Sequence, residues 1–109
     1  MAYDETLAKR LSQLIAQRND FYQQKMFGGV GFLLRGNMCF GVYKNDLILR
    51  LGEEQAQKAL KKANTKPFDI TGRAMKGWVM VTPDGMKSEN TLRRWVTQAI
   101  DFVSQLPRK

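Results

Sequence analysis

The sequence predicts a two-layer α+β domain in which three helices pack against an antiparallel sheet of four or five strands. Apolar residues recur at helical spacing at about residues 4–19, 52–64 and 89–105. The segments between them carry short apolar or alternating runs, separated by turn residues. Because the connections within residues 30–51 are short, the strands there must be antiparallel neighbours. The predicted order is helix, three strands, helix, one or two strands, helix, in a single domain of residues 1–109.

The first predicted helix spans about residues 4–19. Asp4 is a good N-cap, and Glu5 adds negative charge to the first turn, where the helix dipole favours it. Phe21 and Tyr22 follow, and we expect them to cover the exit from this helix. The apolar side of the helix consists of Leu7, Ala8, Leu11, Leu14, Ile15 and Ala16.

Three glycines lie within four positions after this helix, at Gly28, Gly29 and Gly31. A glycine run can bind phosphate where it leads from a strand into a helix. Here the run is predicted to lead out of a helix and into a strand. We therefore expect a structural bend or bulge at the strand entry.

Residues 30–51 are predicted to form a three-stranded meander. Gly36-Asn37 and Asn45-Asp46 are the turn signals that separate its strands. Three of its apolar residues are natural members of the core: Phe32, Phe40 and Leu49.

The second predicted helix spans about residues 52–64. It has acidic residues at its start and lysines at its end, as the helix dipole favours. Its buried stripe is mostly alanine, so we expect it to pack closely on the layer beneath. The stripe consists of Ala56, Ala59, Leu60 and Ala63.

Residues 65–77 have no helical period. Phe68 and Ile70 are predicted to form a short strand, and residues 71–77 a loop or wide hairpin. Residues 78–82 are apolar on both faces, which indicates a covered, interior strand.

The last predicted helix spans about residues 89–105. Ser88 is a good N-cap, and Glu89 lies in the first turn. Arg93 and Arg94 point away from its wide apolar face. That face consists of Leu92, Trp95, Val96, Ala99, Phe102, Val103 and Leu106.

The composition excludes several classes of catalytic site. The chain has no histidine and one cysteine, so it has no imidazole base, no Cys-His pair and no multi-thiolate zinc site. Cys39 lies in a predicted strand, where a cysteine is more often a small core residue than a nucleophile. We therefore predict a protein that is not an enzyme and has no cofactor or metal. Chemistry based on lysine or paired carboxylates stays open.

The composition lacks these catalytic groups but has an excess of positive charge. The chain has 18 Lys and Arg against 10 Asp and Glu, a net charge of +8, which favours an anionic partner. No block of five like charges occurs, so any basic face must be assembled by folding. An ordinary solvated surface is the alternative for each cation. The candidate nucleic-acid or partner-binding residues are Lys61, Lys62, Arg73, Lys76, Arg93 and Arg94.

A second interpretation is a homodimeric protein-interaction module with no nucleic-acid role. The chain has more aromatic residues than a small core strictly needs, although they can also be simply core. The aromatic residues concerned are Phe21, Tyr22, Tyr43, Trp78 and Trp95.

The location expected from the sequence is the cytoplasm. The N-terminus is acidic and leads directly into an amphipathic pattern, unlike a signal peptide. The apolar runs are far shorter than the ~20 residues that cross a bilayer, so no membrane association is expected.

Two stretches resemble the TfoX (Sxy) N-terminal domain family, and the closing amphipathic helix is similar as well. The first stretch, followed by the meander, consists of Lys25, Met26, Phe27, Gly28, Gly29, Val30, Gly31 and Phe32. The second, followed by a methionine and the tryptophan strand, consists of Pro67, Phe68, Asp69, Ile70, Thr71, Gly72 and Arg73. One departure is the segment from Gly72 to Met75, where family members often have a more glycine-rich turn.

The resemblance implies a two-layer α/β domain related to bacterial regulators of DNA uptake. Those regulators act with the cyclic-AMP receptor protein to switch on competence genes. The full-length regulators also carry a helical C-terminal domain, which these 109 residues do not contain. The sequence therefore predicts a non-enzymatic regulatory or adaptor domain that binds protein, nucleic acid or both. Because no helix-turn-helix is evident, any DNA contact should be to the backbone and weakly specific.

Overall fold

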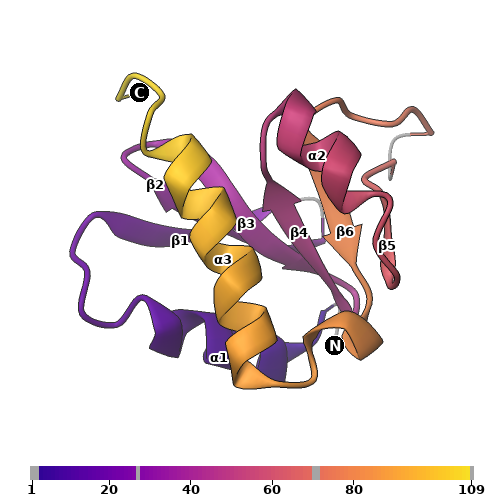
Figure 1. Ribbon diagram of the computed structural model, residues 1–109. Coiled ribbons are helices and arrows are strands. Elements are labelled where there is room, and N and C mark those ends of the chain that lie inside the picture. The colour runs from indigo at the N-terminus through magenta and orange to yellow at the C-terminus, as the bar shows by residue number, and fades with distance from the viewer. Residues whose placement is uncertain (1–2, 27, 70–71, 109) are drawn as a thin grey trace.

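The computed structural model describes residues 3–26, 28–69 and 72–108 (Figure 1). These residues form three α-helices and a six-stranded sheet in the order β1-β2-β3-β4-β6-β5, with all neighbours antiparallel. The predicted α+β class is confirmed, with one strand more than expected. The helices are α1 (Glu5–Leu14), α2 (Glu53–Ala59), α3 (Glu89–Val103) and the short 3₁₀ helix η1 (Pro83–Met86). The strands are β1 (Phe21–Met26), β2 (Gly29–Leu34), β3 (Asn37–Tyr43), β4 (Asp46–Arg50), β5 (Thr65–Pro67) and β6 (Trp78–Val81).

Strand β1 is absent from the sequence prediction. Phe21 and Tyr22 begin this strand, and the Phe21 ring lies beside the residues that follow α1, with the Arg18 guanidinium 5.4 Å from its centroid. The strand pairs with the whole of β2, and its four central side chains are exposed. A strand whose side chains are mostly exposed shows no apolar alternation, which is why the pattern did not indicate it.

Both predicted N-caps are confirmed, but the helices are shorter than predicted. Asp4 Oδ1 accepts a hydrogen bond from the Leu7 N–H at 3.1 Å, and Ser88 Oγ accepts one from the Thr91 N–H at 3.1 Å. The first helix ends at residue 14, the second at 59 and the third at 103. Because α2 ends early, the predicted buried stripe is wrong at its far end: Ala56 and Ala59 are buried, whereas Leu60 and Ala63 are exposed.

The hairpin turns lie one residue earlier than predicted. Arg35 and Gly36 form the β2–β3 turn with φ of 52° and 87°, and Lys44, with φ of 54°, begins the β3–β4 turn. Two-residue hairpin loops require such left-handed conformations because they match the twist of the strands. Gly28, with φ of 79°, lies in the turn between β1 and β2. The glycine run therefore leads from strand to strand, and not out of a helix as predicted.

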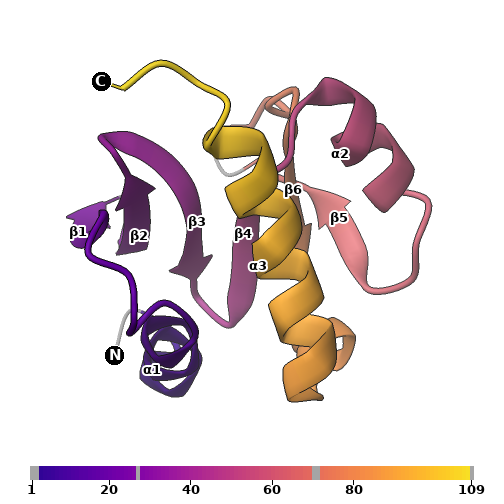
Figure 2. The same ribbon diagram turned by 60° about the vertical axis from the view of Figure 1, so that its left-hand side comes forward.

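All three helices pack on one face of the sheet, where they enclose the main core (Figure 2). The three predicted core residues are fully buried there, and the rings of Phe32 and Phe40 stack at 4.9 Å between centroids. Leu11 of α1 and Leu92 of α3 are also fully buried. This face therefore holds most of the apolar area whose removal from water stabilises the fold.

The opposite face carries a smaller apolar cluster of Ile48, Phe68 and Met80. The chain segment after β5 brings Phe68 onto this face. The predicted short strand at this point is instead β5, which ends at residue 67, and Ile70 lies outside the described residues. Strand β6 lies between β4 and β5, so the predicted interior strand is confirmed.

The glycines of β2 allow close approach to β3 and to β1. A Cβ on Gly29 would collide with the Val42 carbonyl oxygen. A Cβ on Gly31 would lie 3.0 Å from the Met26 sulfur, because this thioether lies against the strand. Gly31 is also paired with Gly41 of β3. The absence of side chains at these positions thus sets how tightly the first three strands pack.

Replacing Gly29 with alanine should destabilise the fold by about 3 kcal/mol, because the new methyl group would force β2 away from β3. The matched control is Gly28→Asn: this position is left-handed with nothing within 4 Å of an added Cβ, and asparagine tolerates that conformation. Urea unfolding of both variants would measure the difference. Equal stability of the two variants would contradict the role assigned to Gly29.

Candidate interaction surfaces

The six predicted binding cations lie as three pairs in different parts of the fold. Arg73 and Lys76 lie on the loop before β6, whereas Lys61 and Lys62 follow α2. The remaining two, on α3, border a shallow hollow with Asn90, Thr97 and Gln98. Lys62 reaches the helix α3, where its Nζ lies 5.4 Å from the centroid of the Trp95 ring. We call Lys62, Arg93 and Arg94 the α3 basic surface.

All six candidate cations are exposed, and none forms an ion pair with another described residue. Six other described cations have carboxylate partners within 4 Å, whereas Lys9, Lys25, Lys44, Arg50 and Arg108 do not. Those paired cations are Arg10, Arg18, Arg35, Lys58, Lys66 and Lys87. The charges of the candidate residues are therefore available to an anionic partner.

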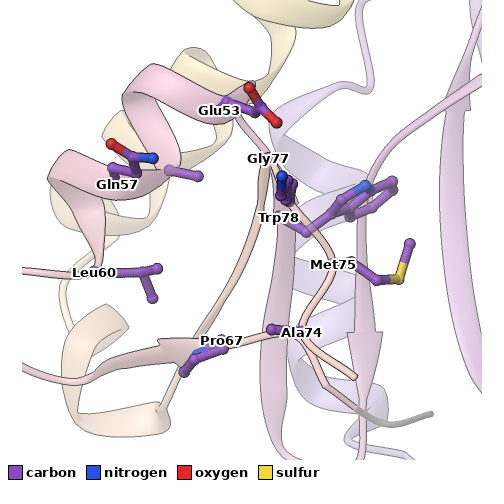
Figure 3. A pocket seen from close by; sticks show the side chains of 10 residues that line it. Glu53, Gln57, Leu60, Pro67, Ala74, Met75, Gly77 and Trp78 are labelled. Carbon is purple, nitrogen blue, oxygen red and sulfur yellow. The ribbon is translucent and has the colours of Figure 1, made fainter. Parts of the chain in front are cut away.

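A hollow of about 270 Å³ opens between α2 and the segment that leads into β6 (Figure 3). We call it the α2 hollow. Figure 3 shows Leu60, which directly follows α2, directed into it, with Pro67 and Ala74 below and Trp78 on the opposite side. Glu53, Gln57 and Lys76 add polar groups to the lining. The hollow is predominantly apolar, as sites that bind organic ligands or side chains usually are.

Two exposed apolar side chains border this hollow. Leu60 is 38% exposed and Met75 is 40% exposed, and among the described residues only Tyr22 is a comparably exposed large hydrophobic. Neither residue was predicted as a site residue from the sequence, since Leu60 matched a buried helical stripe and Met75 lies in a loop. The one sequence signal for an exposed apolar side chain here was a methionine, Met75, in a polar loop bounded by glycines.

The aromatic residues that suggested an interface have different environments. Trp95 is buried, and its indole N–H donates to the Gly85 carbonyl at 3.3 Å. Trp78 is half-buried, with the Phe68 ring at 5.6 Å and the Arg50 guanidinium 5.5 Å from its centroid. Tyr22, at 52% exposed, is the one most open to a partner. Phe21 and Tyr43 are half-buried.

The residues on which the family resemblance rests have structural roles in turns, in strand packing and in the lining of the α2 hollow. Gly28 forms a turn, Gly29 and Gly31 allow strand packing, and Met26 lies over β2. In the second stretch, Pro67 borders the α2 hollow, Phe68 is buried, and Gly72 has a left-handed φ of 85°. Phe27 lies outside the described residues.

Cys39 is fully buried at an irregularity in β3, where the β2–β3 register shifts. Burial disfavours the thiolate and raises the pKa of the Cys39 thiol to about 12. A thiol with this pKa is almost entirely protonated near neutral pH and is a poor nucleophile. Within the described residues, no three His, Cys, Asp or Glu side chains are grouped so as to hold a metal ion.

Asp20 anchors the start of β1. Its carboxylate accepts two hydrogen bonds from the Arg18 guanidinium, at 2.9 and 2.8 Å, and lies 3.5 Å from Arg35. The hydrogen bonds from Arg18 lower the pKa of Asp20 below its ordinary value. The charged form of this carboxylate therefore joins the residue Arg18, which follows α1, to Arg35 in the β2–β3 turn.

No helix in the described part of the chain is long and apolar enough to cross a bilayer. Among known protein families, the TfoX N-terminal domain matches residues 13–103 of the chain. Searches of curated proteins and of solved structures return no significant match.

Above about pH 9 the folded protein should lose stability through Cys39, by up to about 1.4 kcal/mol per pH unit. The unfolded chain releases the thiol proton near the ordinary pKa, whereas the folded chain keeps it until the pH nears the raised value. Rising pH therefore favours unfolding. Urea unfolding of the wild type and of Cys39→Ala at about pH 8 and about pH 10 would measure this. Parallel loss of stability in the two proteins would contradict it.

Proposed function

The chain belongs to the TfoX N-terminal domain family, and on this premise we propose that it is a non-catalytic regulatory adaptor that receives an apolar side chain of a protein partner in the α2 hollow. The single observation that carries the proposal is the location of Leu60 and Met75. Two of the most exposed large apolar side chains border the same hollow. Exposed apolar side chains gathered around a concavity are typical of interaction sites.

The charges near the hollow favour a partner segment that is apolar and acidic. Lys76 lines the hollow, Arg73 lies on the same loop, and Lys61 follows Leu60 directly. None of these cations has a described ion-pair partner. Glu53 is the one acidic residue among those that line the hollow. An excess of unpaired cations around an apolar site speeds the approach of an acidic segment and orients it.

The buried, protonated state of Cys39 supports a role in binding in preference to catalysis. The chain also has no histidine that could serve as a general base. We place the domain in the cytoplasm, with the cyclic-AMP receptor protein as the partner implied by kinship with competence regulators.

Leu60→Glu should weaken binding of the cyclic-AMP receptor protein at least about tenfold, because burying one leucine side chain contributes about 1.5 kcal/mol or more. Fluorescence anisotropy with the labelled receptor would measure the affinity. Ala63→Glu is the matched control, since Ala63 is exposed and lies outside the α2 hollow. The proposal is wrong if both variants bind as the wild type does, or if both lose binding equally.

A second candidate function, binding to the nucleic-acid backbone, is favoured by the α3 basic surface. Arg93 and Arg94 are exposed on consecutive positions of α3 and have no described carboxylate partner. Lys62 extends the surface past the Trp95 ring. Side chains of this kind can neutralise phosphates without selecting a base sequence.

If this surface binds DNA, replacing both Arg93 and Arg94 with alanine should reduce the slope of log affinity against log salt by about 1.8, which is about 0.9 per lost phosphate contact. Anisotropy titrations of a short mixed-sequence duplex at several salt concentrations would give the slope. The charge-matched control is Lys9→Ala with Lys25→Ala, two exposed cations of α1 and β1. Absence of binding by the wild type at low salt would rule the activity out.

A further inference from the structure

We infer that the chain forms a symmetric dimer through β1, whose free edge pairs antiparallel with β1 of a second copy. The sheet would then continue across the two-fold axis. β1 is the outermost strand on its side of the sheet (Figure 2). This inference does not depend on the proposed function, because it uses a different part of the molecule.

The two edges of the sheet differ in how open they are to another strand. β5 has only three residues, and its last residue, Pro67, has no backbone N–H to donate. β1 has six residues, Phe-Tyr-Gln-Gln-Lys-Met, with no proline and four exposed side chains in succession. Native sheets usually blunt long edges with prolines, bulges or a cover. The edge formed by β5 is blunted in this way, and the edge formed by β1 carries only one charged residue.

The pairing of β1 with β2 determines which backbone N–H and C=O groups of β1 point away from the sheet. The Asp20 carbonyl accepts a hydrogen bond from the Arg35 N–H at 3.1 Å. In an antiparallel pair, every second residue directs its N–H and C=O groups to the neighbour. Tyr22, Gln24 and Met26 therefore bond toward β2. The outward groups belong to Phe21, Gln23 and Lys25.

The two-fold symmetry, the number of outward groups that pair and the charges select one register. Opposed residues must share a face of the sheet, so the axis passes through a residue of β1. With the axis at Gln23, all the outward groups pair, and Lys25 of each copy lies opposite Phe21 of the other. With the axis at Lys25, two ammonium groups would face each other, which is unfavourable.

The same register accounts for Tyr22. At 52% exposed, it is the most exposed large hydrophobic among the described residues. With the axis at Gln23, Tyr22 lies opposite Gln24 of the other copy and gains a cross-strand neighbour. A second copy thus satisfies both the free backbone groups and this exposed ring.

Disulfide cross-linking tests the register. In Gln23→Cys the two new thiols face each other, with Cα atoms about 5.5 Å apart, within the range that a disulfide spans. In the control Lys25→Cys they are separated by four residues along the strand, roughly 13 Å. We expect rapid covalent dimer only from Gln23→Cys, since the native Cys39 is buried. Equal cross-linking, or faster cross-linking of Lys25→Cys, would overturn the register.

Sedimentation equilibrium tests the dimer itself. The wild type should sediment as a dimer, and Gln23→Pro, which lacks the outward N–H, as a monomer. Gln23→Ala keeps that N–H, although it loses the side-chain hydrogen bond to Ser12 Oγ, and should stay dimeric. Circular dichroism would verify that Gln23→Pro is folded. A wild type that is monomeric at high concentration, or a folded Gln23→Pro that remains dimeric, would overturn the inference.

Discussion

The close approach of β2 to β3 is the constraint on which the rest of the structure depends. Gly29 has no room for a side chain beside the Val42 carbonyl, and Gly31 lies opposite Gly41. This contact sets the register that stacks Phe32 on Phe40, and the helices then pack on these rings. Because a register shift of one residue would exchange the two faces of the sheet, these glycines determine which side is covered.

Because all three helices pack on one face of the sheet, the opposite face must be covered by other parts of the chain. The segment that returns from β5 to β6 must cover the second face, and it does so through Phe68. The short helix α2 ends before its apolar pattern does, which leaves Leu60 exposed beside this segment. The α2 hollow is therefore a product of how the chain crosses from one edge of the sheet toward its interior.

Several features of the described residues suit the proposed binding role. The cysteine is buried and protonated, and the six candidate cations are exposed without described carboxylate partners. An exposed apolar hollow, an unpaired basic surface and an open strand edge occupy different parts of the molecule. Such a domain could engage a protein, a polyanion and a second copy at once, which suits a regulatory adaptor.

The sequence alone determined the α+β class, both helix caps and the core residues of the meander, because these depend on local spacing and local hydrogen bonds. The family resemblance also followed from short stretches of sequence. Strand β1 and the exposure of Leu60 were decided only by the tertiary structure. An edge strand is defined by the neighbour that it pairs with, and its exposed side chains leave no apolar pattern. Likewise, whether a leucine in a helical stripe is buried depends on where the helix ends and what lies beneath it.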